Sequence, residues 1–367
     1  MMKDIKIVIG SGFGDEGKGQ MTDYFSQNPD TIVVCSNGGA QRGHTVTTPE
    51  GVRHVFHHFG SGIFNGAATY FSEDFIVNPM IFKQEYDDLS ALGYKPKEIY
   101  INRKCMITTP YDMMANQIIE ESRGNNKHGS CGFGIFETIK RYEAGITDLN
   151  YVGLRKYYLD RFKKNNIELP DKWKEVFFDN NVAEHFMRDY DFMDCHCIPI
   201  KDDFLNLFNN IVFEAAQGLL LDQNNLEYFP HLTPSNTGIK NPKKIIENVC
   251  WNDEINIEIC YVSRTYLTRH GAGKFPSECS KDQINKYMFD KTNVPNPFQN
   301  TLRYGTLDLG ELYNRCSKDV GDFGNKKSLA LMHCNECNWN DEELISLFKG
   351  WNIYYSDGET RRNIKLR

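Results

Sequence analysis

The sequence predicts an α/β fold with a mostly parallel central sheet flanked by helices. Short apolar runs typical of buried strands recur at residues 5–9, 31–35, 98–101, 211–214, 255–262 and 328–333. Stretches with helix-like patterns, such as residues 80–92 and 113–121, lie between some of these runs. Because such alternation is typical of βαβ units, we expect the sheet to be parallel.

The expected elements follow one another along a single domain of residues 1–367. The first run, IKIVI, leads into a glycine-rich loop, and the second, TIVVC, ends at a Ser-Asn-Gly-Gly turn. The third run lies between the two helix-like stretches. A charged, Asn-rich segment near residues 151–203 is expected to form a solvated helical insertion or subdomain, and the last three runs follow it.

The composition indicates a globular enzyme of ordinary charge. The 367 residues include 42 basic and 49 acidic side chains, which give a net charge of −7 and disfavour sequence-independent nucleic-acid binding. No stretch approaches the roughly 18 consecutive apolar residues of a membrane helix. Because the sequence enters a strand at MMKDIKIVIG instead of a signal peptide, we expect a cytoplasmic protein without a membrane partner.

The stretch GFGDEGKGQ, residues 12–20, has the spacing of a phosphate-binding loop. Gly12, Gly17 and Lys18 fit the pattern G-x-x-x-x-G-K, in which backbone amides and a lysine hold phosphates at a helix N-terminus. Gly19 stands where a Ser or Thr normally holds magnesium. Asp15 can replace that ligand and can also accept a proton from a substrate.

The second acid of the loop, Glu16, has two readings. It either faces the bound phosphates through a cation or is a first-turn acid that the helix dipole favours. The loop also satisfies G-x-G-x-x-G through Gly12, Gly14 and Gly17, which would indicate a dinucleotide site. However, the strand that follows ends in residues 36–39, SNGG, without the acid that a nicotinamide enzyme needs for the ribose. Phosphate binding is therefore favoured over an NAD-dependent oxidoreductase.

Seven separated stretches resemble, in the same order, the adenylosuccinate synthetase family. They are GDEGKG (residues 14–19), NGGAQRGHT (37–45), HHFGSGI (57–63), GSCGFG (129–134), EAAQGLLLD (214–222), YFPHLTPSNT (228–237) and TRHGAGKFPSE (268–278). The resemblance spans nearly the whole chain and implies the family's P-loop-type fold. It implies a ligase that joins L-aspartate to carbon 6 of a 6-oxopurine nucleotide, after a nucleoside triphosphate has phosphorylated the 6-oxygen.

The resemblance also implies roles for individual residues. Asp15 would take the N1 proton and bind Mg²⁺ with the Gly39 carbonyl, while Lys18 would act on the phosphates and Gln217 on the purine. The triphosphate would lie against Gly12, Gly14, Glu16, Gly17, Gly19, Gly43, His44 and Thr45, and its base against His333, Asn335, Ser356 and Gly358. The acceptor nucleotide would contact Asn37, Ser130, Arg141 and Thr233, with Arg141 reaching the phosphate across a homodimer. The amino acid would contact Thr301 and Arg303.

Four departures from the family pattern bear on catalysis and on the substrates. Family members usually carry a histidine after the second Gly-Gly, as a general acid, where this chain has Ala40. Arg42 replaces a small residue and either reaches a phosphate or is solvated. Asn335 stands for the aspartate that reads guanine, and because an amide both donates and accepts, ATP or dATP is expected in place of strict GTP use. The arginine clamp for the amino acid is reduced to Thr301 and Arg303, so Arg264, Arg269 or Arg42 would contribute, or the amino acid would differ from aspartate.

These departures resemble the viral 2-aminoadenylosuccinate synthase branch, whose acceptor is dGMP and whose members would act in the host cytoplasm. The acceptor is thus left open between IMP, GMP and dGMP. A nucleotide-binding pseudoenzyme or regulator of the same fold is the alternative, because fold alone does not imply catalysis. The retained Asp15, Lys18 and Gln217 favour catalysis.

Overall fold

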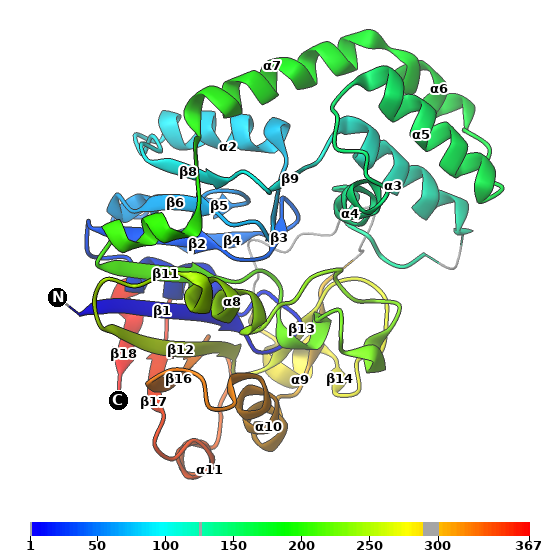
Figure 1. Ribbon diagram of the computed structural model, residues 1–367. Helices are drawn as coiled ribbons and strands as arrows, with labels where there is room; N and C mark the ends of the chain where they lie inside the picture. Colours follow the sequence, from blue (N-terminus) through cyan, green and yellow to red (C-terminus); the bar gives the residue numbers. More distant parts are fainter. Residues whose placement is uncertain (1, 125–126, 289–300) are drawn as a thin grey trace.

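A ten-stranded sheet organises the computed structural model, which describes residues 2–124, 127–288 and 301–367 (Figure 1). The strand order is β10-β8-β6-β2-β11-β1-β12-β16-β17-β18, and all neighbours are parallel except β17 and β18. The strands are β1 (Lys3–Gly10), β2 (Thr31–Cys35), β6 (Ala68–Phe71), β8 (Ile99–Asn102), β10 (Ile198–Ile200), β11 (Asn210–Glu214), β12 (Ile255–Arg264), β16 (Lys326–Met332), β17 (Asn352–Ser356) and β18 (Ile364–Leu366). The predicted mostly parallel α/β fold is confirmed.

All six predicted strands lie in this sheet, and four further strands were not predicted. The four are β6, β10, β17 and β18, which have only three to five residues each. Runs that short carry little periodicity, so some of them resemble loops in the sequence, although β2, β8 and β11 are as short and were predicted. Smaller strands form three additional sheets: β3 (Gly38–Gly39), β7 (Phe75–Val77) and β9 (Met106–Ile107); β4 (His44–Thr47) and β5 (Arg53–Phe56); and β13 (Leu267–Arg269), β14 (Glu278–Cys279) and β15 (Arg303–Gly305).

Alternate side chains of the central strand β1 build two cores on opposite faces of the sheet. Ile5, Ile7 and Ile9 pack in one apolar cluster, whereas Val8 packs in another. The first cluster includes side chains of α8 (Lys240–Asn248), α10 (Leu309–Val320) and α11 (Asp341–Leu347), and the second includes Met21 of α1 (Lys18–Phe25). Because both faces are covered, the second half of β1, IVIG, is apolar and wholly buried, as is typical of parallel strands.

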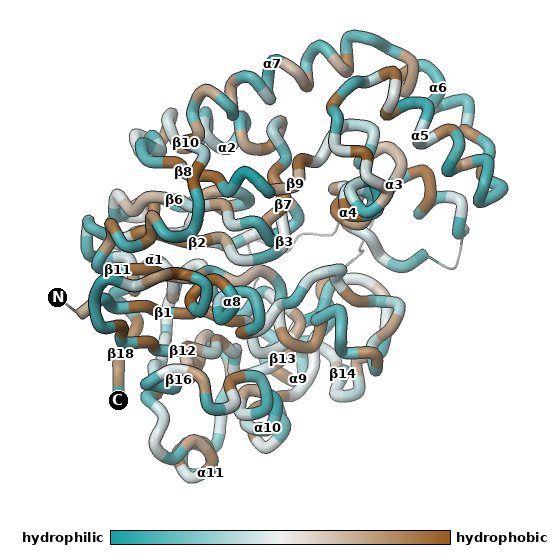
Figure 2. Tube along the Cα trace, in the orientation of Figure 1, coloured by the Kyte–Doolittle hydropathy of each residue, from teal (hydrophilic) through white to brown (hydrophobic). Residues whose placement is uncertain are grey.

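The segment near residues 151–203 is helical, and it ends in the sheet. It contains α5 (Tyr151–Lys164), α6 (Asp171–Phe178), α7 (Asn180–His196) and the edge strand β10. Figure 1 shows α3 (Pro110–Ser122), α4 (Ile135–Glu143), α5 and α6 gathered beside the sheet, with α7 returning past α2 (Pro79–Ala91). Figure 2 shows many hydrophilic residues on α5 to α7, but Tyr111, Leu154 and Phe177 form a small core between α3, α5 and α6. Because β10 pairs with β8, this segment is tied to the main sheet at its C-terminal end.

None of the helices in residues 2–124, 127–288 and 301–367 has the length and apolar character needed to cross a membrane.

Arg141, which was predicted to contact a nucleotide phosphate, lies inside the helical layer. Its Nε donates to Asp112 Oδ1 over 2.8 Å and its Nη2 to Asp112 Oδ2 over 3.0 Å. The guanidinium also donates to the carbonyls of Ile107 and Ile146, and the side chain is fully buried. Tyr158 donates a further hydrogen bond to Asp112. We therefore assign Arg141 a structural role, joining α4 to the start of α3.

We expect Arg141→Ala to lower the free energy of unfolding by about 3–5 kcal/mol, because the variant leaves the buried Asp112 carboxylate without its cation. The matched control is Lys140→Ala on the same helix, whose partly exposed pair with Glu143 should contribute less than about 1 kcal/mol. Urea unfolding of both variants measures the difference. Wild-type stability in Arg141→Ala, together with a raised KM for the acceptor nucleotide, would restore the phosphate role.

Candidate functional site

The glycine loop between β1 and α1 is braced from inside by Glu16. One carboxylate oxygen, Oε1, accepts hydrogen bonds from the amides of Gly12 and Gly14, each over 2.9 Å. The other, Oε2, lies 2.6 Å from Lys18 Nζ, and both side chains are buried. Glu16 therefore acts on the loop and on Lys18, so its carboxylate is not directed at bound phosphates. The Gly12 amide is likewise used by this brace.

Asp15 is held at two points. Its carbonyl oxygen accepts a hydrogen bond from Arg264 Nε over 2.5 Å, and its Oδ2 lies 3.1 Å from His270 Nε2. Burial alone would raise the pKa of Asp15, but the hydrogen bond from His270 and the charges of His270, Arg264 and Lys18 together lower it. The carboxylate is thus ionised at neutral pH, as a cation ligand or a proton acceptor must be.

Three predicted site residues adopt left-handed backbone conformations that side chains other than glycine rarely adopt. The φ angles are 60° at Asp15, 60° at Gln217 and 59° at His333. The only other such residue in the described ranges, Asn166, lies between α5 and α6. Each conformation costs about 1–3 kcal/mol and tends to persist where the surroundings require it, often at functional sites. The concentration of this strain around one loop cluster supports a functional site there.

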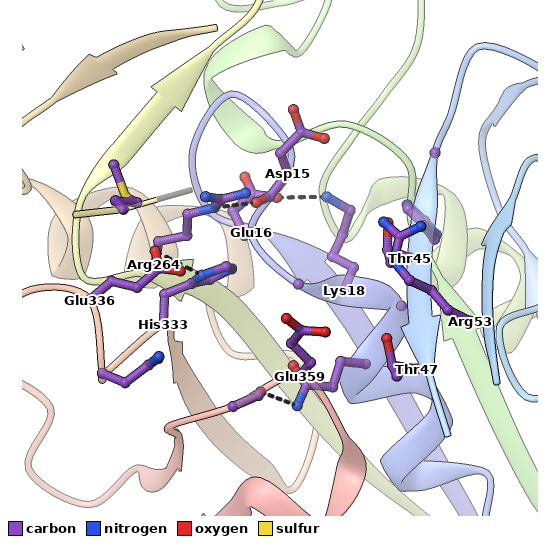
Figure 3. A pocket seen from close by; sticks show the side chains of 18 of the residues that line it. Asp15, Glu16, Lys18, Thr45, Thr47, Arg53, Arg264, His333, Glu336 and Glu359 are labelled. Atoms are coloured by element: carbon purple, nitrogen blue, oxygen red, sulfur yellow. Dashed lines mark hydrogen bonds and ion pairs between the residues drawn. The ribbon is translucent and has the colours of Figure 1, made fainter. Parts of the chain in front are cut away.

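A cavity of about 190 Å³ opens between the start of α1, β4, the end of β16 and the loop after β17 (Figure 3). It brings together most residues predicted to bind the triphosphate: Glu16, Gly17, Lys18, Gly19, Gly43, His44, Thr45, His333, Asn335 and Gly358. Seven further lining residues were not predicted from the sequence: Gln20, Thr47, Arg53, Tyr266, Met288, Glu336 and Glu359. Gln20, Glu336 and Glu359 each directly follow a predicted residue, so they alone had a signal in the sequence. Glu336 also contacts a predicted residue. Its Oε2 lies 3.1 Å from His333 Nδ1.

Ser356 supports this cavity from behind instead of lining it. Its hydroxyl accepts a hydrogen bond from Gln20 Nε2 over 3.1 Å and donates to the Gly358 carbonyl over 3.0 Å. Gln20 also donates to the carbonyls of Gly358 and Thr360. The side chain of Gln20, which no sequence motif singled out, therefore fastens the loop after β17 to helix α1.

A second cavity, of about 620 Å³, lies on the other side of the glycine loop. Of the predicted residues, it is lined by Gly14, Asp15, Lys18, Gly43, His44, Ser130, Gln217 and Thr233. It is also lined by Gln41, Arg123, His231, Arg269 and His270, none of which had been given a site role except Arg269 as an alternative carboxylate ligand. Asp15, Lys18, Gly43 and His44 line both cavities, so these four residues form their shared wall.

Asn37 and Gly39 line neither cavity. The Asn37 side chain is buried and bonds to both the amide and the carbonyl of Ala216 and to Ser235, so it joins two loops. The Gly39 carbonyl accepts the amide of Arg42 over 3.1 Å. The predicted phosphate contact of Asn37 and the predicted metal contact of Gly39 stay predictions, because a carbonyl oxygen that accepts one hydrogen bond keeps a second lone pair.

The two residues predicted to bind the amino acid also lie outside the cavity walls. Thr301 is exposed, and Arg303 donates to both carboxylate oxygens of Glu278 over 2.7 and 2.5 Å. Arg269 is the cation that lines the larger cavity nearby, and its Nη atoms donate to the carbonyls of Lys274 and His231. Burial lowers the pKa of Arg269 to about 10, so its charge persists at neutral pH.

His44 belongs to a buried charge cluster that links the second glycine loop to β11. Its Nδ1 lies 2.9 Å from Glu214 Oε1, and Arg42 Nη1 lies 3.4 Å from Glu214 Oε2. Arg42 is buried and also donates to the carbonyls of residues 57–59, so it is not solvated, although it lines the larger cavity. Ala40 is fully buried, and its methyl group lines neither cavity.

No three or more His, Cys, Asp or Glu side chains gather into a metal-binding cluster in the part of the chain that the structure describes. Asp15 nevertheless fits a Mg²⁺ ligand, because its carboxylate is ionised and 28% exposed at the shared wall. Mg²⁺ is commonly held by one or two carboxylates together with substrate phosphates and water. A protein cluster is thus not required for a magnesium nucleotide to bind here.

We expect the stability of the fold to fall with acid through Glu214. Burial raises the pKa of Glu214, but the charges of His44 and Arg42 outweigh it and bring the pKa to about 2. Because the folded pKa lies below the unfolded value, this contribution, about 3 kcal/mol, is fully present above about pH 5 and is lost as the pH falls towards 2. Urea unfolding between pH 7 and about pH 3 should show more than half of this loss, with a shallower pH dependence in Glu214→Gln. Equal slopes would contradict the assignment.

Comparison with known proteins places the chain among enzymes of purine nucleotide metabolism. The family model described as adenylosuccinate synthetase matches residues 7–323. The chain is 30% identical over 299 residues to the adenylosuccinate synthetase of Synechocystis sp., covering 78% of this chain and 65% of that protein. It is 31% identical over 300 residues to the enzyme of Limosilactobacillus reuteri, covering 76% and 66%. The matched region thus spans slightly less than two thirds of these relatives.

Solved structures share the fold at low sequence identity. The fully ligated adenylosuccinate synthetase of Plasmodium falciparum superposes with a TM-score of 0.71 at 18% identity, covering 99% of each chain. The succinoaminodeoxyadenylate synthetase of cyanophage S-2L, bound to dGMP and to dATP as an energy donor, gives a TM-score of 0.65 at 14% identity, covering 100% of this chain and 95% of that one. With the family match over residues 7–323, which include both loops of the shared wall, the chain belongs to the adenylosuccinate synthetase family.

Proposed function

We propose that this chain is a C–N bond-forming ligase that joins L-aspartate to carbon 6 of a 6-oxopurine nucleotide at the expense of a nucleoside triphosphate. The observation that supports this most directly is the wall of Asp15, Lys18, Gly43 and His44 between two cavities. Phosphoryl transfer from one nucleotide to another requires both to meet in line at one place. We assign the smaller cavity to the triphosphate and the larger one to the acceptor nucleotide and the amino acid.

The chemistry would run in two steps, because the 6-oxygen is a poor leaving group. Asp15 takes the proton from N1, and the 6-oxygen then attacks the γ-phosphorus while the bond to the β-phosphate oxygen breaks and the nucleoside diphosphate leaves. The amine of aspartate next adds to carbon 6 and inorganic phosphate departs, which yields adenylosuccinate or its 2-amino form. Lys18 and the amides of the glycine loop would stabilise the charge on the transferred group.

His44 is our candidate for the histidine that acts on the 6-oxygen, instead of position 40. It lines both cavities, and the Glu214 carboxylate lies 2.9 Å from its Nδ1. Burial lowers the pKa of His44, and the neighbouring carboxylate offsets part of this effect by favouring the protonated form. The arrangement is that of an imidazole oriented by a carboxylate, which is suited to proton donation. If His44 supplies this proton, the alanine at position 40 is not an argument for a pseudoenzyme.

Mg²⁺ would neutralise the transferring phosphoryl group when bound. Among the described acidic residues, Asp15 alone lines both cavities, so it is our proposed protein ligand. Arg269 is our proposed ligand for a carboxylate of the amino acid, because it is a buried arginine that lines the larger cavity and has no carboxylate partner among the described residues, whereas Arg42 is paired with Glu214 and Arg303 with Glu278. Ser130, Gln217 and Thr233 are kept as acceptor ligands. A homodimer in the cytoplasm, or in the host cytoplasm for a viral protein, is inferred from the family resemblance alone.

The test is mass spectrometry of reactions containing L-aspartate, Mg²⁺, one of ATP, dATP or GTP, and one of IMP, GMP or dGMP. We expect a succinylated product from at least one pair, and a drop of about 10²–10⁴-fold in Asp15→Ala, because proton transfer by a positioned group contributes that much. Circular dichroism checks that the variant is folded.

The products of this panel would also separate the possible functions. Product from dGMP with ATP or dATP would place the enzyme in the 2-aminoadenine branch, and product from IMP would make it an adenylosuccinate synthetase. Bound nucleotides without product from any pair would favour the pseudoenzyme. Unchanged turnover in Asp15→Ala would contradict the mechanism.

We expect Asn335→Asp to shift the donor preference from ATP towards GTP. Asn335 lines the smaller cavity, and its amide can donate to or accept from either base, whereas a carboxylate only accepts and so favours the N1 and N2 hydrogens of guanine. A difference of one hydrogen bond to a charged group, about 1.5–3 kcal/mol, corresponds to at least a tenfold change in the ratio of kcat/KM values. Steady-state kinetics with both triphosphates measures this ratio. An unchanged ratio would exclude Asn335 from reading the base.

A further inference from the structure

One short segment of the chain contacts Asp15 on the side of each of the two cavities that Asp15 lines. The segment leaves β12 at Arg264, turns through β13 and reaches His270 just after it. Arg264 lines the smaller cavity and donates to the Asp15 carbonyl over 2.5 Å. His270 lines the larger cavity, and its Nε2 lies 3.1 Å from Asp15 Oδ2. The backbone of Asp15 is thus held from the donor side and its carboxylate from the acceptor side.

The geometry at Asp15 requires such support. Its φ of 60° is unfavourable for a side chain with a Cβ, so the surrounding contacts must maintain it. The side chain is 28% exposed, and a partly exposed carboxylate without a partner would sample several rotamers. A group that acts on a reacting atom has to be held within a fraction of an ångström of its productive position, by neighbours that are themselves held.

We propose that His270 is a positioning residue for the ligase reaction, because its imidazole fixes the orientation of the Asp15 carboxylate at the shared wall. This inference rests on the proposed function, in which Asp15 accepts the N1 proton. His270 received no role from the sequence, since a motif does not reveal which of its side chains meets a loop some 250 positions away. The hydrogen bond acts whether or not the imidazole carries a charge, so the proposal does not depend on its titration.

The neighbouring residue shows why His270 is separable from the fold. Arg269 is buried and packs over the rings of Phe13 and Tyr228, with its guanidinium carbon 4.5 and 5.4 Å from their centroids. That contact holds the segment in place. His270 itself is 22% exposed at the cavity wall, and partly exposed pairs of this kind add little to folding. Variants at His270 should therefore fold.

The experiment compares His270→Leu with His270→Gln, since glutamine can place an amide donor near the position of Nε2. We expect kcat to fall about 10–100-fold in His270→Leu, the usual effect of removing a group that orients a reactive or metal-binding residue. The KM values for both nucleotides should stay within about twofold, because the proposed role concerns orientation and not substrate binding. His270→Gln should recover most of kcat. The control is His185→Ala on the exposed face of α7, which should leave kcat unchanged.

Wild-type kcat in His270→Leu, a raised KM with unchanged kcat, or no recovery in His270→Gln would each overturn the proposal while leaving the proposed function intact. If instead the wild-type protein forms no product with any nucleotide pair, the proposed function fails and the contact is tested separately. The imidazole ¹⁵N resonances of His270, assigned by their absence from His270→Gln, should then shift in Asp15→Asn. Unshifted resonances would show that the contact does not exist in solution.

Discussion

The hydrogen-bonded ion pair of Glu16 and Lys18 is the constraint on which the arrangement of both cavities depends. Glu16 occupies the inside of the glycine loop, and two neighbouring glycines leave it room. A Cβ at Gly10 would lie 2.5 Å from Glu16 Oε2, and one at Gly218 would lie 2.6 Å from Oε1. The carboxylate therefore joins the end of β1 to the turn after β11, and this turn carries Gln217. Glu16 would repel a phosphate if its carboxylate faced one, but its hydrogen bonds with Gly12, Gly14 and Lys18 use it to shape the loop instead.

The parallel sheet explains why residues from distant parts of the chain meet at this loop. The carboxyl ends of parallel strands lie at one edge of a sheet, where ligands of open α/β folds bind. The loops after β1, β11 and β16 supply Asp15, Gln217 and His333, and the segment that leaves β12 supplies His270 just after β13. Glu214, at the end of β11, pairs with His44 and Arg42 and so attaches the second glycine loop to the sheet. Each strand thus delivers one part of the shared wall or of the cavities beside it.

The sequence predicted the parts of this arrangement that depend on local pattern. Long apolar runs such as β1 and β12 were found, and so was the loop of Lys18, because its glycine spacing is local. For Asn37, Arg141 and Arg303 the sequence revealed none of the intramolecular partners that the structure shows. Each is saturated by a partner far along the chain, such as Asp112 for Arg141, and single-sequence patterns do not reveal such pairs. The contact of His270 with Asp15 was missed for the same reason, since it forms only when β12 and β1 pair.

The charges of the smaller cavity give a physical reason for the expected need for a divalent cation. Its acidic lining residues are Asp15, Glu16, Glu336 and Glu359, and its lysine and arginine residues are Lys18, Arg53 and Arg264. Lys18, the lysine of the loop, is already paired with Glu16. The acidic side chains also outnumber the lysine and arginine side chains of this cavity, which therefore offers no excess of positive charge to a triphosphate. Backbone amides and the N-terminus of α1 contribute partial charges only. A magnesium ion carried on the phosphates would change this balance, and the exposed carboxylate of Asp15 would then attract the nucleotide instead of repelling it. We infer that Asp15 makes the smaller cavity select the magnesium-bound form of the nucleoside triphosphate.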